Sequence, residues 1–245
     1  MSLLPGLARF GRFLGQIVWS TVSNPLPVGR ALEEAHRIGV NSLPILLVVS
    51  VFVGTNLSVQ GASAFSTIHA ERYVGMFVAL AGVREMAPIM VASMVAAKAG
   101  TEMASQIAVM RIQEQIDALE VMAIDPYWFL ITPRLLGILL VLPALTMISI
   151  FTLVVSAYGV AITQLGLDGH TFLEQATATT HAMDLVYCAV KAFVFGLVIC
   201  VLSCYHGFTS GAGASGVGRA TNAAVVMAAV SCAILNYLLS ELLFG

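Results

Sequence analysis

A run of charged and amide side chains at residues 111–122 lies between two long apolar stretches of the chain. Its polar side chains are Arg111, Gln113, Glu114, Gln115, Asp117 and Glu120. At helical spacing, Ile112, Ile116, Leu119 and Met122 face another side, and Asp125-Pro126 ends the run. This pattern fits a solvated loop helix. It also fits a coupling helix, near 108–124, that docks in a groove of a cytoplasmic partner through polar specificity and apolar anchorage.

A second charged feature, Arg84-Glu85, lies inside an otherwise apolar stretch. Ionisable groups at membrane depth are costly, and they usually face a protein interior or a wet cavity. Neighbouring helical residues point about 100° apart, so the two are not an intrahelical pair. They are interpreted either as a salt bridge to another helix or subunit, or as part of a substrate cavity or gate. Lys191, in a later apolar stretch, is interpreted as snorkelling near a helix end.

Asn56 and Gln60 add a polar pair to another apolar stretch. They are four residues apart and share one helical face. Side chains of this kind bond to a neighbouring membrane helix or line a cavity. Both roles remain open from the sequence.

Motifs for catalysis and ATP binding are missing. The two lysines, Lys98 and Lys191, follow Ala97 and Val190, so the chain has no Gly-Lys-Ser/Thr P-loop. The histidines are scattered and predict no metal site, and no nucleophile–base constellation is visible. We therefore predict a non-catalytic chain, and any ATP hydrolysis must come from a separate polypeptide.

Composition assigns these features to a membrane protein. Of 245 residues, 59% are hydrophobic and only 10% charged, with a mean hydropathy of +0.94. Soluble domains carry about 25% charged residues. The net charge of −2 excludes a basic nucleic-acid surface, so no nucleic-acid partner is expected.

The predicted fold is all-α, with about five transmembrane helices and a coupling helix between spans two and three. A bilayer core of ~30 Å needs ~20 apolar residues as helix. Five stretches qualify, at residues 42–61, 73–97, 135–165, 185–205 and 221–244. An amphipathic segment at 8–20 and a second polar-faced helix, which we expect to end near Gly39, predict interfacial helices before them. The chain is expected to form one permease domain over 1–245, with interfacial helices at 1–40 and the transmembrane region at 41–245.

Basic residues predict the orientation. Eight of the eleven Lys and Arg residues lie in the N-terminal segment or near 98–134 and 206–220. Arg72 alone lies on the opposite side of the membrane, and Arg84 and Lys191 lie within spans. Because cytoplasmic loops carry the excess of Lys and Arg, the N-terminus is expected to be cytoplasmic.

Several segments together resemble the MlaE/YrbE permease family. The resemblance extends from about residue 40 to the C-terminus. The matching segments are Val51–Gly54, Val59–Gly61, Val83–Pro88, Ala97–Gly100, Met110–Pro126, Pro133-Arg134 and Gly216–Thr221. One departure is Lys98, at a position where many relatives carry arginine, because lysine lacks the planar fork of that side chain.

The resemblance implies the membrane subunit of an MCE-type ABC transporter in the bacterial inner membrane, which moves phospholipids or related lipids between that membrane and the cell envelope. It implies a second permease subunit, expected to be identical, and a cytoplasmic ATPase dimer that supplies ATP and Mg and engages the loop helix. It also implies an MCE-protein hexamer on the outer side and, in some systems, a STAS-domain protein. By position, it assigns a lipid pocket to Leu57, Phe65, Ile68, Arg84 and Glu85; Asn56 and Gln60 are added on their own chemistry.

Two other functions stay open from the residues. An ATP-independent secondary transporter or channel would favour internal repeats and broken helices at the midplane. A membrane-embedded enzyme would need a nucleophile–base or metal constellation. Neither pattern is visible in the sequence.

Overall fold

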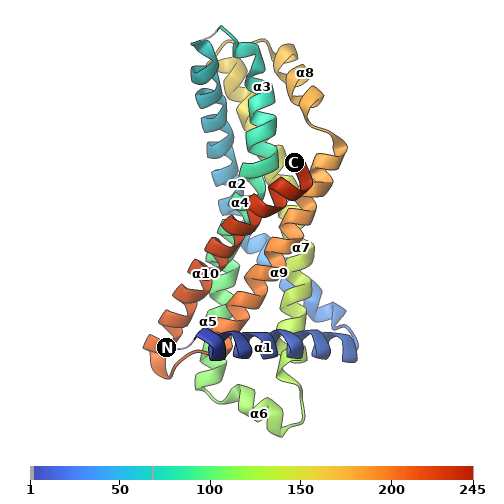
Figure 1. Cartoon of the computed structure of the whole chain (residues 1–245), viewed down its shortest axis with the longest axis vertical. Helices are drawn as coiled ribbons and strands as arrows, with labels where there is room; N and C mark the ends of the chain where they lie inside the picture. Colours follow the sequence, from blue (N-terminus) through green and yellow to red (C-terminus); the bar gives the residue numbers. More distant parts are fainter. Residues whose placement is uncertain (1–2, 68, 245) are drawn as a thin grey trace. The chain divides into compact units, whose positions relative to one another are not determined.

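The computed structural model describes residues 3–67 and 69–244, with side-chain surroundings from residue 8 onward. The described residues form helices joined by short turns, without a strand (Figure 1). In chain order the elements are α1 (Leu3–Ser23), α2 (Val28–Ser66), η1 (Glu71–Tyr73), α3 (Val74–Phe77), η2 (Val78–Met86), α4 (Ala87–Val95), η3 (Ala96–Gly100), α5 (Thr101–Ile112), α6 (Gln115–Val121), η4 (Tyr127–Ile131), α7 (Thr132–Thr163), α8 (Gly169–Thr179), α9 (Ala182–Phe208) and α10 (Gly213–Phe244).

Five helical stretches are long and apolar enough to cross a membrane, which confirms the predicted all-α membrane fold. They cover Val28–Ser66, Glu71–Ile112, Tyr127–Thr163, Ala182–Phe208 and Gly213–Phe244. Each is longer than the apolar core predicted for it, because the helices continue past the apolar residues into more polar turns.

The second polar-faced segment is not a separate helix, so the predicted helix end near Gly39 is wrong. Helix α2 begins at Val28 and continues through Gly39 into the first span. An added Cβ at Gly39 would lie 3.4 Å from a methyl group of Val141. This is an ordinary van der Waals distance, so a side chain would fit there, and the helix continues because a single glycine is tolerated inside a helix.

The described chain forms two compact units, each with its own interior. Unit 1 comprises residues 1–40, 95–141 and 195–232, and unit 2 comprises 41–94, 142–194 and 233–245. The single-domain assignment for residues 1–245 stays a prediction.

Unit 1 contains α1, which packs on the protein through Phe13 and Ile17, both nearly fully buried. Phe13 lies edge-on to Tyr205, with ring centroids 5.4 Å apart, and Ser20 donates a hydrogen bond to Asp125 at 2.6 Å. The face that carries Trp19 remains exposed, together with Val18 and Val22. The predicted apolar face of this segment is thus divided, with one part covering the protein and the other free to meet lipid.

Unit 2 is built on close approaches between helices at small residues. Its core gathers side chains from α2, the second span, α7, α8 and α9, including Leu57, Val83, Leu153 and Phe172. An added Cβ at Gly54 of α2 would lie 2.2 Å from the Leu153 carbonyl oxygen of α7. Because membrane helices associate chiefly by tight packing, such glycines set the helix spacing.

We expect Gly54→Ala to destabilise the protein by ~1–3 kcal/mol, because the methyl group would meet backbone that cannot move aside cheaply. The apparent melting temperature in detergent, followed with a thiol-reactive dye, measures this, since the four cysteines are free and buried. Gly159→Ala on α7 is the matched control, because its added Cβ meets no atom within 4 Å. Equal melting temperatures for the two variants would contradict the packing role of Gly54.

Candidate functional site

Arg84 and Glu85, the adjacent charged residues in the middle of the second span, lie in η2, a π-helical segment of unit 2. π-Helical turns inside helices occur frequently at functional sites. The Arg84 guanidinium is ion-paired with Asp184 at 2.9 Å and donates to the Thr179 carbonyl oxygen at 3.3 Å. It also lies 4.9 Å from the ring centroid of Phe244. Arg84 is thereby held by the start of α9, the end of α8 and the end of α10.

Glu85 faces a different set of partners. One carboxylate oxygen lies 3.2 Å from the Lys191 ammonium, and the other accepts from the Asn236 amide at 2.8 Å. The Ser240 hydroxyl lies 2.9 Å from this second oxygen. The adjacent charges thus form two separate pairs, in agreement with the expectation that they do not pair with each other.

The interpretation of Lys191 as a snorkelling side chain is wrong. Its side chain has no exposed surface, and its ammonium donates to Glu85, to the Ser240 hydroxyl at 2.7 Å and to the Arg84 carbonyl oxygen at 2.9 Å. Pro88, four residues after Arg84, has no backbone N–H. Because Pro88 cannot make the usual helical bond back to the Arg84 carbonyl, that oxygen can accept the lysine.

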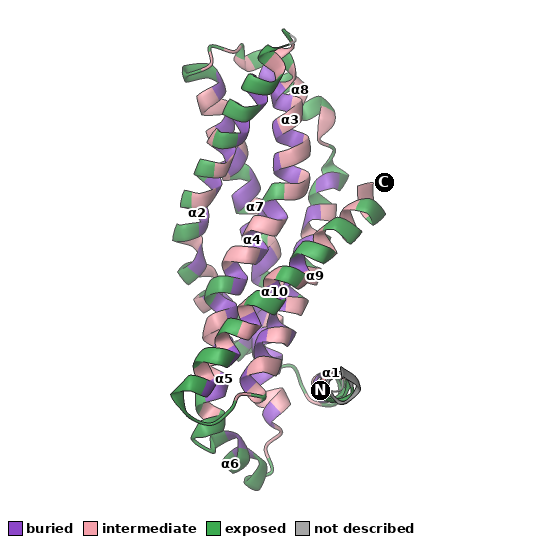
Figure 2. Ribbon diagram, turned by 60° about the vertical axis from the view of Figure 1, so that its left-hand side comes forward, coloured by how far each residue is buried: buried purple, intermediate pink, exposed green. Residues whose placement is uncertain are grey.

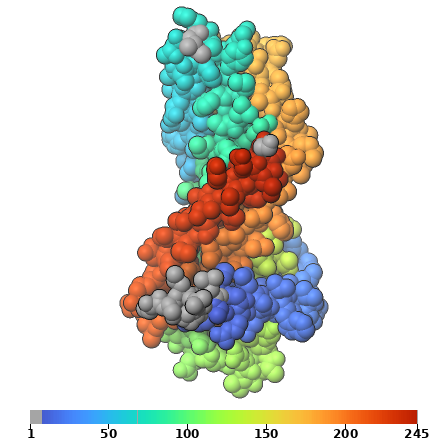
Figure 3. Space-filling model, viewed as in Figure 1, coloured from blue at the N-terminus to red at the C-terminus, as the bar shows by residue number. Residues whose placement is uncertain are grey.

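The sequence contained a signal for this network. Asp184 and Lys191 are seven residues apart on α9, and Asn236 and Ser240 are four apart on α10. Both spacings place their side chains on one helical face. Two polar pairs at helical spacing in apolar spans, facing the Arg84-Glu85 pair, are what a buried ionic network requires. Figure 3 shows the last turns of α10 lying on the surface beside α9.

The other predicted pocket residues divide into two groups. Leu57 is buried in the core of unit 2, and Phe65 packs against that core with its ring 6.2 Å from the ring of Phe77. Asn56 and Gln60 instead lie on an exposed face of α2 and hydrogen-bond to each other. Ile68 lies outside the described residues. The structure therefore places Asn56 and Gln60 on an exposed face of α2, and Arg84 and Glu85 in a network around Lys191 in which their side chains are 24% and 38% exposed.

The exposed face of α2 is otherwise apolar. Val48, Phe52 and Val59 are each more than two-fifths exposed, and Figure 2 shows the green, exposed edge of this helix. In unit 2 this face has no covering element among the described residues. Lipid or a helix of another protein chain is suited to cover this apolar face of α2.

The helix expected over 108–124 is divided in two, so its predicted continuity is wrong. Helix α5 ends at Ile112, and Glu114 adopts a left-handed conformation with φ 56° before α6 begins. Ala123, with φ 58°, follows α6. Non-glycine residues rarely adopt this conformation, and two of them bracket a helix of seven residues.

Helix α6 is anchored by two residues of the predicted apolar face. Ile116 and Leu119 are buried at 1% and 8% exposure, as their spacing predicts, whereas Ile112 and Met122 are exposed. The Arg111 guanidinium pairs with Asp117 at 2.6 Å and so joins α5 to α6. The remaining predicted coupling residues, Gln113, Glu114, Gln115 and Glu120, are exposed.

The sequence prediction missed the apolar end of this surface. Val121 is 87% exposed, beside the exposed Met122. Figure 2 shows α6 as a mostly green helix of unit 1. An exposed acidic helix that has an apolar tip and is anchored by buried side chains is suited to dock in a groove of another protein.

Comparison with known proteins identifies the relatives of the chain. Residues 31–242 match the family described as Permease MlaE. A probable ABC transporter permease protein of Rickettsia felis is 35% identical, over 97% of this chain and 92% of that protein. A similarly named protein of Synechocystis is 32% identical, over 94% of this chain and 88% of its own length. The chloroplastic protein TRIGALACTOSYLDIACYLGLYCEROL 1 of Arabidopsis thaliana is 33% identical, over 94% of this chain and 66% of its own length.

We expect Lys191→Met to destabilise the protein by ~1–3 kcal/mol, since it leaves the Glu85 carboxylate without its cation. Adding Glu85→Gln to this variant should restore part of the loss, because the amide keeps a hydrogen-bonding group but removes the unpaired charge. The apparent melting temperatures of the two single variants and the double variant form the cycle that measures the coupling.

Arg72→Met is the control, because it removes an exposed positive charge from the same unit. If the effects of Lys191→Met and Glu85→Gln on the melting temperature add up in the double variant, Lys191 and Glu85 do not stabilise each other.

Proposed function

The chain belongs to the MlaE permease family of ABC transporter permeases, and on this premise we propose that it conducts lipids for an ATP-driven transporter in a bacterial inner membrane. The family is that of a non-catalytic, multi-pass membrane subunit. The observation that carries the proposal is α6, a short exposed acidic helix anchored by Ile116 and Leu119. ATP and Mg would bind in a separate ATPase, since this chain has no P-loop.

Coupling to the ATPase would use the outer surface of α6. Glu114, Glu120 and the tip at Val121 and Met122 are exposed and available to a partner groove. Arg111 and Asp117 are paired with each other, so they would hold α5 and α6 together as the partner moves. A rigid connection of this kind passes a displacement of α6 to the second span.

A lipid substrate is supported by two observations. The name of the Arabidopsis relative contains that of a galactolipid. In unit 2, the apolar face of α2 carries the polar pair Asn56 and Gln60, which suits a molecule with apolar chains and a polar headgroup. We assign the lipid pocket to this face, to Leu57 and Phe65 of the same helix, and to Arg84 and Glu85 of η2. Ile68 belongs to the proposed pocket by the family resemblance alone. Phospholipids or related lipids are the proposed class.

The proposed assembly rests on the family resemblance, and the exposed face of α2 supports its second permease subunit. A second copy of this permease would cover the exposed face of α2 and complete the pocket. An MCE-protein hexamer would sit on the outer side, and a STAS-domain protein would join in some systems. The excess of basic residues in the N-terminal segment and near 98–134 supports a cytoplasmic N-terminus.

Purification from native membranes in mild detergent tests the proposal. We expect an ATP-binding subunit and an MCE-domain protein to copurify, and lipid mass spectrometry of the same sample to find enriched phospholipid. A sample that retains ATPase but no lipid above a control membrane protein would contradict the lipid assignment alone. A sample without any ATPase would contradict the coupling role of α6.

We expect Glu114→Lys to lower lipid-stimulated ATPase activity of the assembled complex by at least about tenfold, because a reversed charge at a docking contact costs more than 1.4 kcal/mol. ATPase assays in proteoliposomes measure this. Glu174→Lys is the matched control, since it makes the same charge change on α8, where the side chain is 65% exposed. Equal activities for the two variants would remove Glu114 from the coupling surface.

A further inference from the structure

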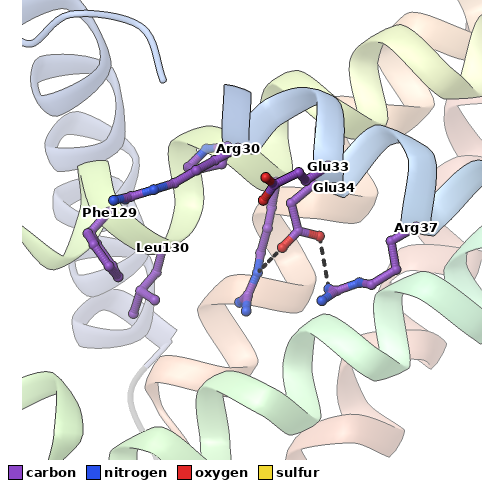
Figure 4. Close-up of a pocket in the computed structure, with 8 residues that line it drawn as sticks. Arg30, Glu33, Glu34, Arg37, Phe129 and Leu130 are labelled. Atoms are coloured by element: carbon purple, nitrogen blue, oxygen red, sulfur yellow. Dashed lines mark ion pairs between the residues drawn. The ribbon is translucent and has the colours of Figure 1, made fainter. Parts of the chain in front are cut away.

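A charged cavity of about 410 Å³ lies in unit 1, apart from the residues assigned to coupling and to the lipid pocket. The first turns of α2 line it with Arg30, Glu33, Glu34 and Arg37, and the start of the third span lines it with Phe129, Leu130, Pro133 and Arg134 (Figure 4). Its volume falls in the range of ~300–1,000 Å³ typical of small-molecule sites. Three guanidinium groups and two carboxylates thus surround one cavity.

Part of this charge is committed to holding the helices together. Glu34 pairs with Arg37 at 2.9 Å and lies 3.8 Å from Arg134 Nε. Arg134 Nη2 also donates to the Gln106 side chain at 2.9 Å. These contacts join α2, α5 and α7 within unit 1, and they need no ligand.

The other part is free to bind. Within the described chain, Arg30 makes no ion pair, and its guanidinium lies 4.2 Å from the ring centroid of Phe129. Figure 4 shows Arg30 extended over Phe129, while Glu34 and Arg37 face each other. A guanidinium stacked on a ring still presents its edge N–H groups, which match a phosphate.

Two further groups define the ligand. The Nη1 nitrogen of Arg134, a residue only 6% exposed, is buried and lacks a hydrogen-bond acceptor among the described residues. The exposed Glu33 carboxylate forms no ion pair with any of the described residues. Two free guanidinium edges and one free carboxylate are complementary to a ligand that carries both a phosphate and an ammonium group.

The surroundings indicate that this ligand comes from the membrane. Leu26, Val28 and Leu32, beside the lining residues of α2, are 55–60% exposed. Exposed apolar side chains at the start of a membrane span are suited to contact acyl chains. A soluble phosphate ester would make no use of them.

We propose that this cavity binds the headgroup of an amine-bearing phospholipid, with Arg30 and Arg134 on its phosphate and Glu33 on its ammonium group. The site belongs to unit 1 and shares no residue with the proposed transport pocket. It therefore does not rest on the proposed transport of lipids. A lipid bound there would tie the first turns of α2 to the start of the third span.

Trp128 provides a local reporter, because Arg30 lies 6.0 Å from its ring centroid. In a Trp19→Phe background it is the only tryptophan, and delipidated full-length protein in detergent can be titrated with phosphatidylethanolamine carrying brominated acyl chains. We expect saturable quenching, and an apparent Kd raised about tenfold by Arg30→Gln, since one charge-assisted phosphate contact is lost. Unchanged binding by Arg30→Gln would overturn the proposal.

Arg219→Gln is the matched control, because it removes one exposed positive charge from unit 1 outside the cavity. Its Kd should equal that of the parent protein. A rise equal to that of Arg30→Gln would show only a general charge effect and would overturn the site. Arg30 is itself exposed, so its replacement should leave the melting temperature unchanged.

Two further titrations identify the ligand chemistry. Brominated phosphatidylglycerol should bind several-fold more weakly than phosphatidylethanolamine. The Glu33→Gln variant should bind the two lipids equally. Equal binding of the two lipids to the parent protein would overturn the role of Glu33. Soluble glycerophosphoethanolamine should not displace the lipid at equal concentration. Displacement at equal concentration would assign the site to a free phosphate ester instead of a membrane lipid.

Discussion

The buried ammonium of Lys191 constrains how the elements of unit 2 pack. An ammonium group has three hydrogens to donate, and here the Arg84 carbonyl oxygen, the Glu85 carboxylate and the Ser240 hydroxyl accept them. These acceptors belong to the second span and α10, while the lysine belongs to α9. A charge without exposed surface is tolerable only with such partners, so the three elements must be positioned together.

The irregular second span supplies one acceptor of the same network. Pro88 removes one helical hydrogen bond, and the preceding turns are π-helical over Val78–Met86. The wider turn and the missing N–H leave a carbonyl oxygen for Lys191. Arg84 and Glu85 then point to different partners, Asp184 on one side and Lys191 on the other. Local irregularity and ionic pairing thus support each other in this span.

Unit 1 uses charge differently. Its buried guanidinium, Arg134, is shared between Glu34 and Gln106, and one of its nitrogens has no acceptor among the described residues. Its exposed charges on α6 lie on a helix anchored by only two buried side chains. The charges around Lys191 in unit 2 pair with one another, whereas in unit 1 part of the charge is left open for other molecules.

The sequence alone determined the properties that depend on local patterns. Five apolar stretches predicted five spans, because an apolar helix satisfies its own backbone groups in the bilayer whether lipid or another helix lies beside it. The spacing of Ile116 and Leu119 predicted the buried side of α6, because residues three apart share one face of a helix. The missing P-loop predicted a non-catalytic chain, and the permease family confirms it. The tertiary structure decided what depends on residues far apart in the chain. Lys191 and Glu85 are separated by 106 positions, and only packing brings their side chains into contact. It also decided the break at Glu114, where a single left-handed residue ends a helix that the hydrophobic period would have continued.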